Sequence, residues 1–142
     1  MDFQKFENNY LLRLDKGEEI VSTLLDFCTK HSISLGKISG IGSTNKVKIG
    51  LFNTHTKRYS SKEFIGDFEI VNLTGNISTM NNEPYLHIHA TISDSNLDAF
   101  AGHLDSAIIS GTAEIFIECL PGRVDRKFSE EIGLNLFRFI KE

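Results

Sequence analysis

A strict alternation of apolar and polar side chains over residues 86–92 constrains the fold more than any other stretch of this chain. One parity carries the apolar side chains Leu86, Ile88, Ala90 and Ile92. The other parity carries His87 and His89. Side chains two residues apart on a strand point to the same face. We therefore expect a strand with one face in a core and two neighbouring imidazoles on the opposite face.

The same two-residue period recurs along the chain and predicts further strands. Residues 112–119 alternate, and their apolar parity holds Ala113, Ile115, Ile117 and Cys119. Residues 68–78 carry apolar side chains on both parities, which is typical of a strand covered on both faces. Shorter strands are expected at residues 10–14, 47–51, 58–64 and 132–140. Turns are expected at residues 54–57 and 81–84, which are rich in polar and turn-forming side chains.

One stretch has a helical period instead, and it runs to His31. Its apolar stripe consists of Ile20, Val21, Leu24, Leu25, Phe27 and Cys28. Asp15 is the expected N-cap, and Glu18 completes a capping-box pattern. Residues 95–104 form a connector with loosely helical apolar spacing. The predicted fold class is α+β, with a mostly antiparallel twisted sheet flanked by one or two helices in a single domain over residues 1–142.

The charge balance and the cysteines restrict the classes of function. The 15 Lys and Arg residues are outnumbered by 19 Asp and Glu, for a formal net charge of −4. This argues against strong non-specific binding of nucleic acid, which depends on basic side chains neutralising phosphates. The chain has neither a basic leader followed by an apolar run nor an apolar stretch of membrane-spanning length. With Cys28 and Cys119 expected as buried free thiols, we expect a cytoplasmic protein without membrane contact.

Residues 36–43 (GKISGIGS) are glycine-rich but do not fit a phosphate-binding loop. Such loops open a helix after a strand, whereas the alternation over residues 47–51 predicts another strand here. Gly40 and Gly42 are therefore expected to permit a bulge or close backbone packing. Ser39 and Ser43 lack the strand–turn–helix context of a catalytic nucleophile.

The histidines leave two interpretations open. His103, directly after Gly102, is a candidate third partner for His87 and His89. Three neutral imidazoles form a common zinc site that keeps an open position. The alternative is an amphipathic strand whose two histidines lie on a polar or interface face. Of the remaining histidines, His31 is expected as a cation at a helix end, and His55 as a turn residue.

Several short segments resemble the PPC domain, a family of plants and prokaryotes, in their order and spacing. They are residues 38–42 (ISGIG), 50–52 (GLF) with Tyr59, 66–70 (GDFEI), 73–77 (LTGNI), 86–89 (LHIH), 102–104 (GHL) and 112–115 (TAEI). The resemblance implies a homotrimer built on an antiparallel sheet with flanking helices. For stand-alone prokaryotic members it also implies a divalent metal, zinc above all, held by residues matching His87, His89 and His103 near a subunit boundary.

The resemblance also implies an association with DNA, because plant members carry this domain beside AT-hook motifs. No AT-hook is present in this chain. The plant partner-contact segment Gly-Arg-Phe-Glu-Ile-Leu corresponds to residues 66–71 (GDFEIV), where Asp67 replaces the arginine and reverses the charge.

Three functions therefore compete. The first is a homotrimeric metal-binding module with a regulatory or interaction role. The second is a small metal-dependent enzyme, of hydrolase or lyase type, with a small molecule bound near the metal at a subunit interface. The third is a DNA-binding protein in its own right, which the acidic balance disfavours. An enzyme needs a general base, for which Glu114 is a candidate, and the other acids close in sequence are Asp94, Asp98 and Asp105.

Overall fold

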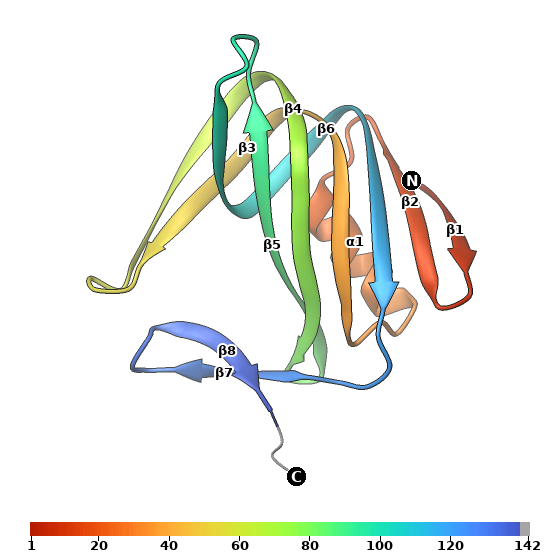
Figure 1. Cartoon of the computed structure of the whole chain (residues 1–142), viewed down its shortest axis with the longest axis vertical. Coiled ribbons are helices and arrows are strands. Elements are labelled where there is room, and N and C mark those ends of the chain that lie inside the picture. Colours follow the sequence, from red (N-terminus) through yellow and green to blue (C-terminus); the bar gives the residue numbers. More distant parts are fainter. Residues whose placement is uncertain (140–142) are drawn as a thin grey trace.

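A computed structural model describes residues 1–139, and within them it contains one helix and eight strands (Figure 1). In chain order the elements are β1 (Asp2–Phe6), β2 (Asn9–Asp15), α1 (Ile20–Lys30), β3 (Gly36–Asn53), β4 (Arg58–Met80), β5 (Glu83–Ser93), β6 (Ala99–Cys119), β7 (Asp125–Ser129) and β8 (Leu134–Arg138). The strands form one sheet in the order β1-β2-β6-β3-β4-β7-β8, with β5 pairing with both β4 and β6. All strand pairs are antiparallel except β4 with β7, which confirms the predicted α+β, mostly antiparallel class with a single flanking helix in the described residues.

Four strands close on one another, because β3 pairs with β4, β4 with β5, β5 with β6 and β6 with β3. Strands β3, β4 and β6 have 18, 23 and 21 residues, well beyond the usual strand length of about 3–10. They curve strongly (Figure 1), and the β3–β4 register shifts between Gly40 and Gly42. A side chain at Gly42 would collide with the Thr112 carbonyl oxygen on β6. The bulge and the close packing expected of these glycines are confirmed.

The sequence patterns predicted several shorter segments within these long strands. Residues 36–43 and 47–51 belong to β3, and residues 58–64 and 68–78 belong to β4. The connector predicted at residues 95–104 is wrong from Ala99 onward, since that part is the start of β6. Its loosely helical apolar spacing is outweighed by backbone pairing with β5 over Ala99–His103.

The predicted helix is present, but its N-cap is Glu19 and not Asp15. The Glu19 carboxylate accepts hydrogen bonds from the backbone N–H groups of Val21 and Ser22 at 3.0 and 2.7 Å. It also accepts one from Ala107 of β6 at 3.0 Å, so the cap attaches the helix to the sheet. A tertiary contact of this kind leaves no pattern in the local sequence.

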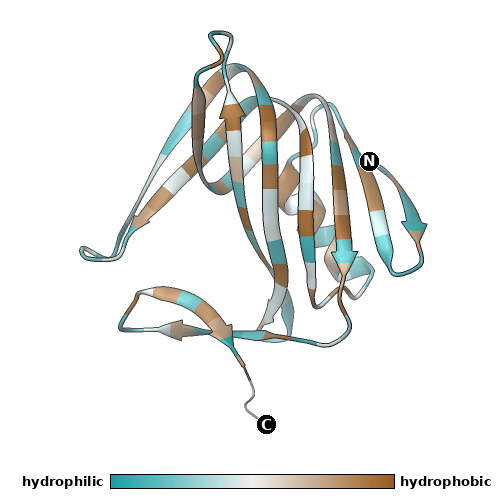
Figure 2. Ribbon diagram, viewed as in Figure 1, coloured by the Kyte–Doolittle hydropathy of each residue, from teal (hydrophilic) through white to brown (hydrophobic). Residues whose placement is uncertain are grey.

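The apolar face of α1 lies against β5 and β6 and buries Ile20, Leu24, Phe27 and Cys28. The hydropathy alternates along the strands in Figure 2, and the apolar parities of residues 86–92 and 112–119 fill the core as predicted. Ile88, Ile92, Ile115 and Ile117 are at most 2% exposed. Across residues 1–139, no helix combines the length and apolar character needed to cross a membrane.

The C-terminal strands β7 and β8 form a hairpin that stands apart from the closed strands and joins them through a single bridge, Thr79 with Asp125 (Figure 1). The strand predicted at residues 132–140 corresponds to β8, and residue 140 lies outside the described residues. Strands β1 and β7 were not predicted, because each has only five residues and no clear alternation. The turn at 54–57 is confirmed, whereas the turn predicted at 81–84 is confined to residues 81–82, because Glu83 and Pro84 already pair with β4 as the start of β5. Asn81 and Asn82 both have positive φ, as a two-residue hairpin requires.

Candidate metal site

Strand β5 presents His87 and His89 on the face opposite the core, as the alternation predicted. Its residues Ile88 and Ala90 are buried at 2% and 3% exposure, whereas His87 is half-buried and His89 exposed. The pleat therefore aims both imidazoles away from the core and toward the same side. Their ring centroids lie 5.1 Å apart.

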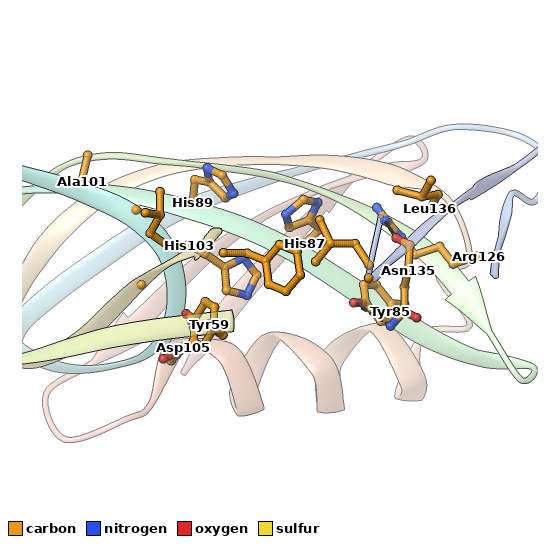
Figure 3. A pocket seen from close by; sticks show the side chains of 16 residues that line it. Tyr59, Tyr85, His87, His89, Ala101, His103, Asp105, Arg126, Asn135 and Leu136 are labelled. Atoms are coloured by element: carbon orange, nitrogen blue, oxygen red, sulfur yellow. Dashed lines mark hydrogen bonds between the residues drawn. The ribbon is translucent and has the colours of Figure 1, made fainter. Parts of the chain in front are cut away.

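Strand β6 supplies His103, which is the direct cross-strand partner of His89. The His103 ring lies 5.3 Å from that of His87 and 5.6 Å from that of His89, between centroids. One ring nitrogen from each histidine lies within 4.8 Å of the others. The three side chains converge in Figure 3, so the fold brings together the set that the sequence singled out.

The surroundings of this cluster favour neutral imidazoles. Burial, followed by the neighbouring charges of His103, Arg126 and His89, lowers the pKa of His87 from 6.5 to about 4. Burial and His89 also lower the pKa of His103, although Asp105 opposes that shift. A neutral imidazole has a free lone pair, which is the state that binds a metal.

The three histidines open into a cavity of about 810 Å³, a size that suits a small organic molecule (Figure 3). Its wall comes from β3, β4, β5, β6 and the β7–β8 hairpin. The apolar side chains in this wall are Leu51, Phe52, Leu134 and Leu136. Its polar side chains, besides the three histidines, are Tyr59, Tyr85, Asp105, Arg126 and Asn135.

Tyr59 and Asp105 form a hydrogen-bonded pair beside His103. The Tyr59 hydroxyl donates to Asp105 Oδ1 at 2.6 Å. Burial and this carboxylate raise the pKa of Tyr59 above its usual value, so the hydroxyl stays protonated. Asp105 Oδ2 is buried and has no hydrogen-bond partner within residues 1–139. The Tyr59 ring meets the His103 ring edge-on, with centroids 6.2 Å apart.

Arg126 projects from β7 and fixes the hairpin over the cavity. Its Nε donates to Ser78 Oγ at 2.8 Å, and its two terminal nitrogens donate to Asn76 Oδ1 at 2.8 Å and to the Asn135 carbonyl at 2.7 Å. The guanidinium also lies 4.8 Å from the ring centroid of Tyr85 and 4.2 Å from that of Phe137. Burial lowers the pKa of Arg126, but an arginine remains charged in a protein.

The other acids proposed from the sequence do not reach the histidines. Asp94 lies in the turn after β5, where its Oδ1 accepts from the backbone N–H groups of Asn96 and Asp98. Glu114 is exposed on β6 and does not line the cavity. Among the four acids only Asp105 lines it. The general-base role considered for Glu114 is therefore wrong for this cavity.

His31 lies at the C-terminal end of α1, where the sequence placed it, and is the C-cap residue of that helix. Its ring lies 4.3 Å from that of Phe27, 5.1 Å from that of Phe3 and 5.3 Å from that of Tyr10, between centroids. Its Nε2 is buried without a hydrogen-bond partner in residues 1–139. His55 lies in the β3–β4 turn as expected, and its backbone N–H donates to Asn53 Oδ1.

Sequence reasoning missed Arg126, Tyr85 and Asn135 as cavity residues. Arg126 lies in a five-residue strand without periodicity, and Asn135 is recognisable only once β8 folds back toward β5. Tyr85 is on the same parity as His87 and was the one detectable signal.

The chemistry of the donor set fits a divalent transition metal. Three imidazoles and no carboxylate converge within 4.8 Å, which suits zinc, copper, nickel or iron better than calcium or magnesium. Nitrogens bound to one tetrahedral zinc at about 2.0–2.1 Å lie about 3.4 Å apart.

Comparison with known proteins agrees with this fold. A family model described as the Plants and Prokaryotes Conserved (PCC) domain matches residues 1–121. A crystal structure of a Pyrococcus horikoshii plant- and prokaryote-conserved (PPC) protein is 32% identical, with a TM-score of 0.86 over 99% of this chain and 96% of that one. No curated protein matches the chain.

Two further solved structures carry descriptive names. A Bacteroides thetaiotaomicron protein, named a "putative DNA binding protein", is 40% identical with a TM-score of 0.95 over 97% of this chain and 96% of that one. A "metal-containing protein" from Archaeoglobus fulgidus is 32% identical with a TM-score of 0.88 over 98% of this chain and 99% of that one.

Proposed function

We propose that this chain, which belongs to the Plants and Prokaryotes Conserved domain family, is a single-domain protein that binds a divalent metal, zinc, through His87, His89 and His103. The observation that carries the proposal is the convergence of three ring nitrogens within 4.8 Å at the wall of a cavity. The similarity to a metal-containing protein of Archaeoglobus fulgidus supports it.

Zinc is the favoured ion because it accepts an all-imidazole set without a geometric demand from its d electrons. Once bound, it would act as a Lewis acid toward a ligand in the cavity. The lowered pKa values of His87 and His103 keep both ligands deprotonated at neutral pH, where protons do not compete with the ion.

Elemental analysis of purified protein tests this proposal. We expect about one zinc per chain after supplementation, and a loss of most of it in His89→Ala. His55→Ala is the matched control, because His55 is also exposed but lies in the β3–β4 turn and does not line the cavity. Equal metal content in the two variants, or no metal in the parent protein, would contradict the proposal.

The role we propose is a metal-dependent binding module with a regulatory or interaction function, in which the metal and the cavity together hold a small molecule. The cavity volume of about 810 Å³ and its mixture of apolar walls with few polar groups support ligand binding.

A second candidate is a small metal-dependent enzyme of hydrolase or lyase type. It is favoured by an open position, because three protein ligands do not fill a tetrahedral site. Asp105 has an unpartnered buried Oδ2 and replaces Glu114 as the candidate to accept a proton. Turnover of hydrolase or lyase substrate panels by zinc-loaded protein, lost in His89→Ala, would favour the enzyme. Turnover unchanged in that variant would exclude metal catalysis.

The assembly we propose is a homotrimer. It is supported by large apolar side chains that this chain leaves exposed. Leu51, which lines the cavity, is 68% exposed. Ile41 is 57% exposed, Ile65 75% and Val71 54%. Contact with further copies of the chain would remove this apolar area from water. Light scattering at micromolar concentration is expected to give three times the chain mass of 16.0 kDa, and a monomer would contradict the trimer.

An association with DNA is supported by the names of similar structures, among them the one from Bacteroides thetaiotaomicron, and the net charge of −4 opposes it. Electrostatic affinity for DNA is greatest at low salt. We expect no shift of a duplex by this protein at low ionic strength, and a salt-sensitive shift would favour the DNA-binding alternative. The free thiols of Cys28 and Cys119 support a reducing compartment, the cytoplasm.

A further inference from the structure

Arg126 brings a positive charge into the cavity that no described carboxylate neutralises. Within residues 1–139, no acidic oxygen lies within 4.0 Å of its guanidinium, although every ion pair around Arg13 and Arg123 includes an aspartate. Its hydrogen-bond partners are all neutral, namely Ser78, Asn76 and the Asn135 carbonyl. A half-buried charge with neutral partners favours an anionic ligand.

The guanidinium has hydrogen-bond donors that these three bonds do not use. Arginine has five N–H groups, and the three hydrogen bonds above use one on each nitrogen. One N–H therefore remains on each terminal nitrogen, which matches the two oxygens of a carboxylate or phosphate group. The rings of Tyr85 and Phe137 hold the plane of the guanidinium at 4.8 and 4.2 Å, so it is oriented before a ligand arrives.

This charge shares the cavity with the three histidines. Asn76, which accepts from Arg126, is the cross-strand partner of His87 on β4. Arg126 and His87 both line this cavity (Figure 3). The apolar side chains Leu134 and Leu136 of β8 line the same cavity.

We propose that Arg126 is the anion-binding residue of this cavity, and that the ligand is a small organic oxyanion whose carboxylate or phosphate contacts Arg126 while its other end reaches the metal held by His87, His89 and His103. This inference rests on the proposed metal site for the second contact only. Arg126 comes from the β7–β8 hairpin, which follows the region matched by the family model, residues 1–121.

The experiment is a titration followed by NMR of the backbone amides and the Arg126 side-chain Nε–H. The probes are straight-chain ω-hydroxycarboxylates of two to six carbons, the diols of the same length, and the corresponding phosphate monoesters of those diols. We expect the preferred anion to bind at least about tenfold more tightly than its neutral diol and to shift the Arg126 Nε–H signal. The carboxylate and phosphate series show which group is preferred. Equal binding of anions and diols would overturn the proposal without any variant.

Arg126→Gln should abolish the preference for the anion, and Arg126→Lys should keep part of it, because the charge remains while the two-pronged geometry is lost. Arg123→Gln is the charge-matched control, since Arg123 precedes the same strand but pairs with Asp125 and Asn82 outside the cavity. An undiminished anion preference in Arg126→Gln, or an equal loss in Arg123→Gln, would overturn the assignment.

Titrations with zinc-loaded and metal-stripped protein separate this inference from the proposed metal site. Metal-stripped protein should still prefer anions through Arg126, because that contact does not need the metal, and a parent protein that holds no zinc after supplementation but keeps this preference would refute the metal proposal alone. A protein that holds one zinc per chain but binds diols and anions equally would refute the role of Arg126 alone.

Discussion

Two regions of this molecule place histidine among aromatic rings, and they differ in what surrounds each imidazole. His31 lies against Phe3, Tyr10 and Phe27, with ring centroids 4.3–5.3 Å away, and in the part of the chain that the structure describes it belongs to no group of three or more metal-ligating side chains. His87, by contrast, lies within 5.3 Å of two other imidazoles at an open cavity. The comparison teaches that convergence of ligating groups, and not burial or aromatic contact, distinguishes a candidate binding site from a packing position.

The same substitution at both positions gives the largest expected difference. Loss of a residue that merely hydrogen-bonds a metal ligand can lower metal affinity by roughly 100-fold. His87→Leu should lower zinc affinity by more than that, because it removes a ligand itself. His31→Leu should leave zinc content unchanged. It should alter the free energy of unfolding by only about 1 kcal/mol, since Nε2 of His31 has no partner to lose in the described residues. Competition with a chromogenic chelator and urea denaturation measure the two quantities. Loss of zinc from His31→Leu would contradict the interpretation of His31 as a packing position.

Truncation of Phe27, one of the rings that surround His31, should lower stability and leave zinc affinity unchanged. Phe27 is 3% exposed and meets Phe3, Tyr10 and His31. Phe27→Ala should lower the free energy of unfolding by about 3–5 kcal/mol, through lost burial and the cavity that remains. Zinc affinity in the fraction that stays folded should not change. Urea denaturation at a fixed zinc concentration checks both parts, and a parallel fall in affinity would show that the two regions are coupled.

A change in the spacing between β4 and β5 beneath the histidines should have an intermediate effect on zinc affinity. Gly75 on β4 is the cross-strand partner of Ile88, and a Cβ there would collide with the His87 carbonyl oxygen. Gly75→Ala should therefore move β5 and lower zinc affinity by about tenfold or more, since small displacements of ligands are costly. Gly111→Ala is the control, because its Cβ would meet only the flexible Ser43 side chain. Equal zinc affinity of both variants, by the same chelator competition, would contradict this prediction.

The smallest expected effect is the pH dependence of the metal-free protein. The pKa of His87 is about 4 in the folded chain and 6.5 when unperturbed, so the unfolded chain takes up the proton first as the pH falls. The stability associated with a neutral His87 is therefore fully present above pH 6.5 and is lost progressively between about 6.5 and 4. His87→Gln should flatten the pH dependence of urea midpoints in that window. An unchanged slope would indicate that burial of this ring has little energetic weight.

The sequence by itself determined much of the sheet and the identity of the three histidines. Alternation placed Ile88 and Ile92 in the core and His87 and His89 on the opposite face, because the strand period of two is a local property of the backbone. The apolar stripe of α1 was equally local. His103 was within reach of sequence reasoning only as a candidate, supported by the family resemblance.

Tertiary structure decided what no local pattern carries. His103 meets His89 because β5 and β6 pair in one particular register, and Glu19 replaces Asp15 as N-cap because it also binds Ala107 of β6. Arg126 enters the cavity because the β7–β8 hairpin folds back onto β4, where Ser78 and Asn76 accept its hydrogen bonds. The sequence period sets which face of a strand a side chain occupies. Long-range pairing sets which side chains meet there, and that is why the histidines were predictable while the arginine beside them was not.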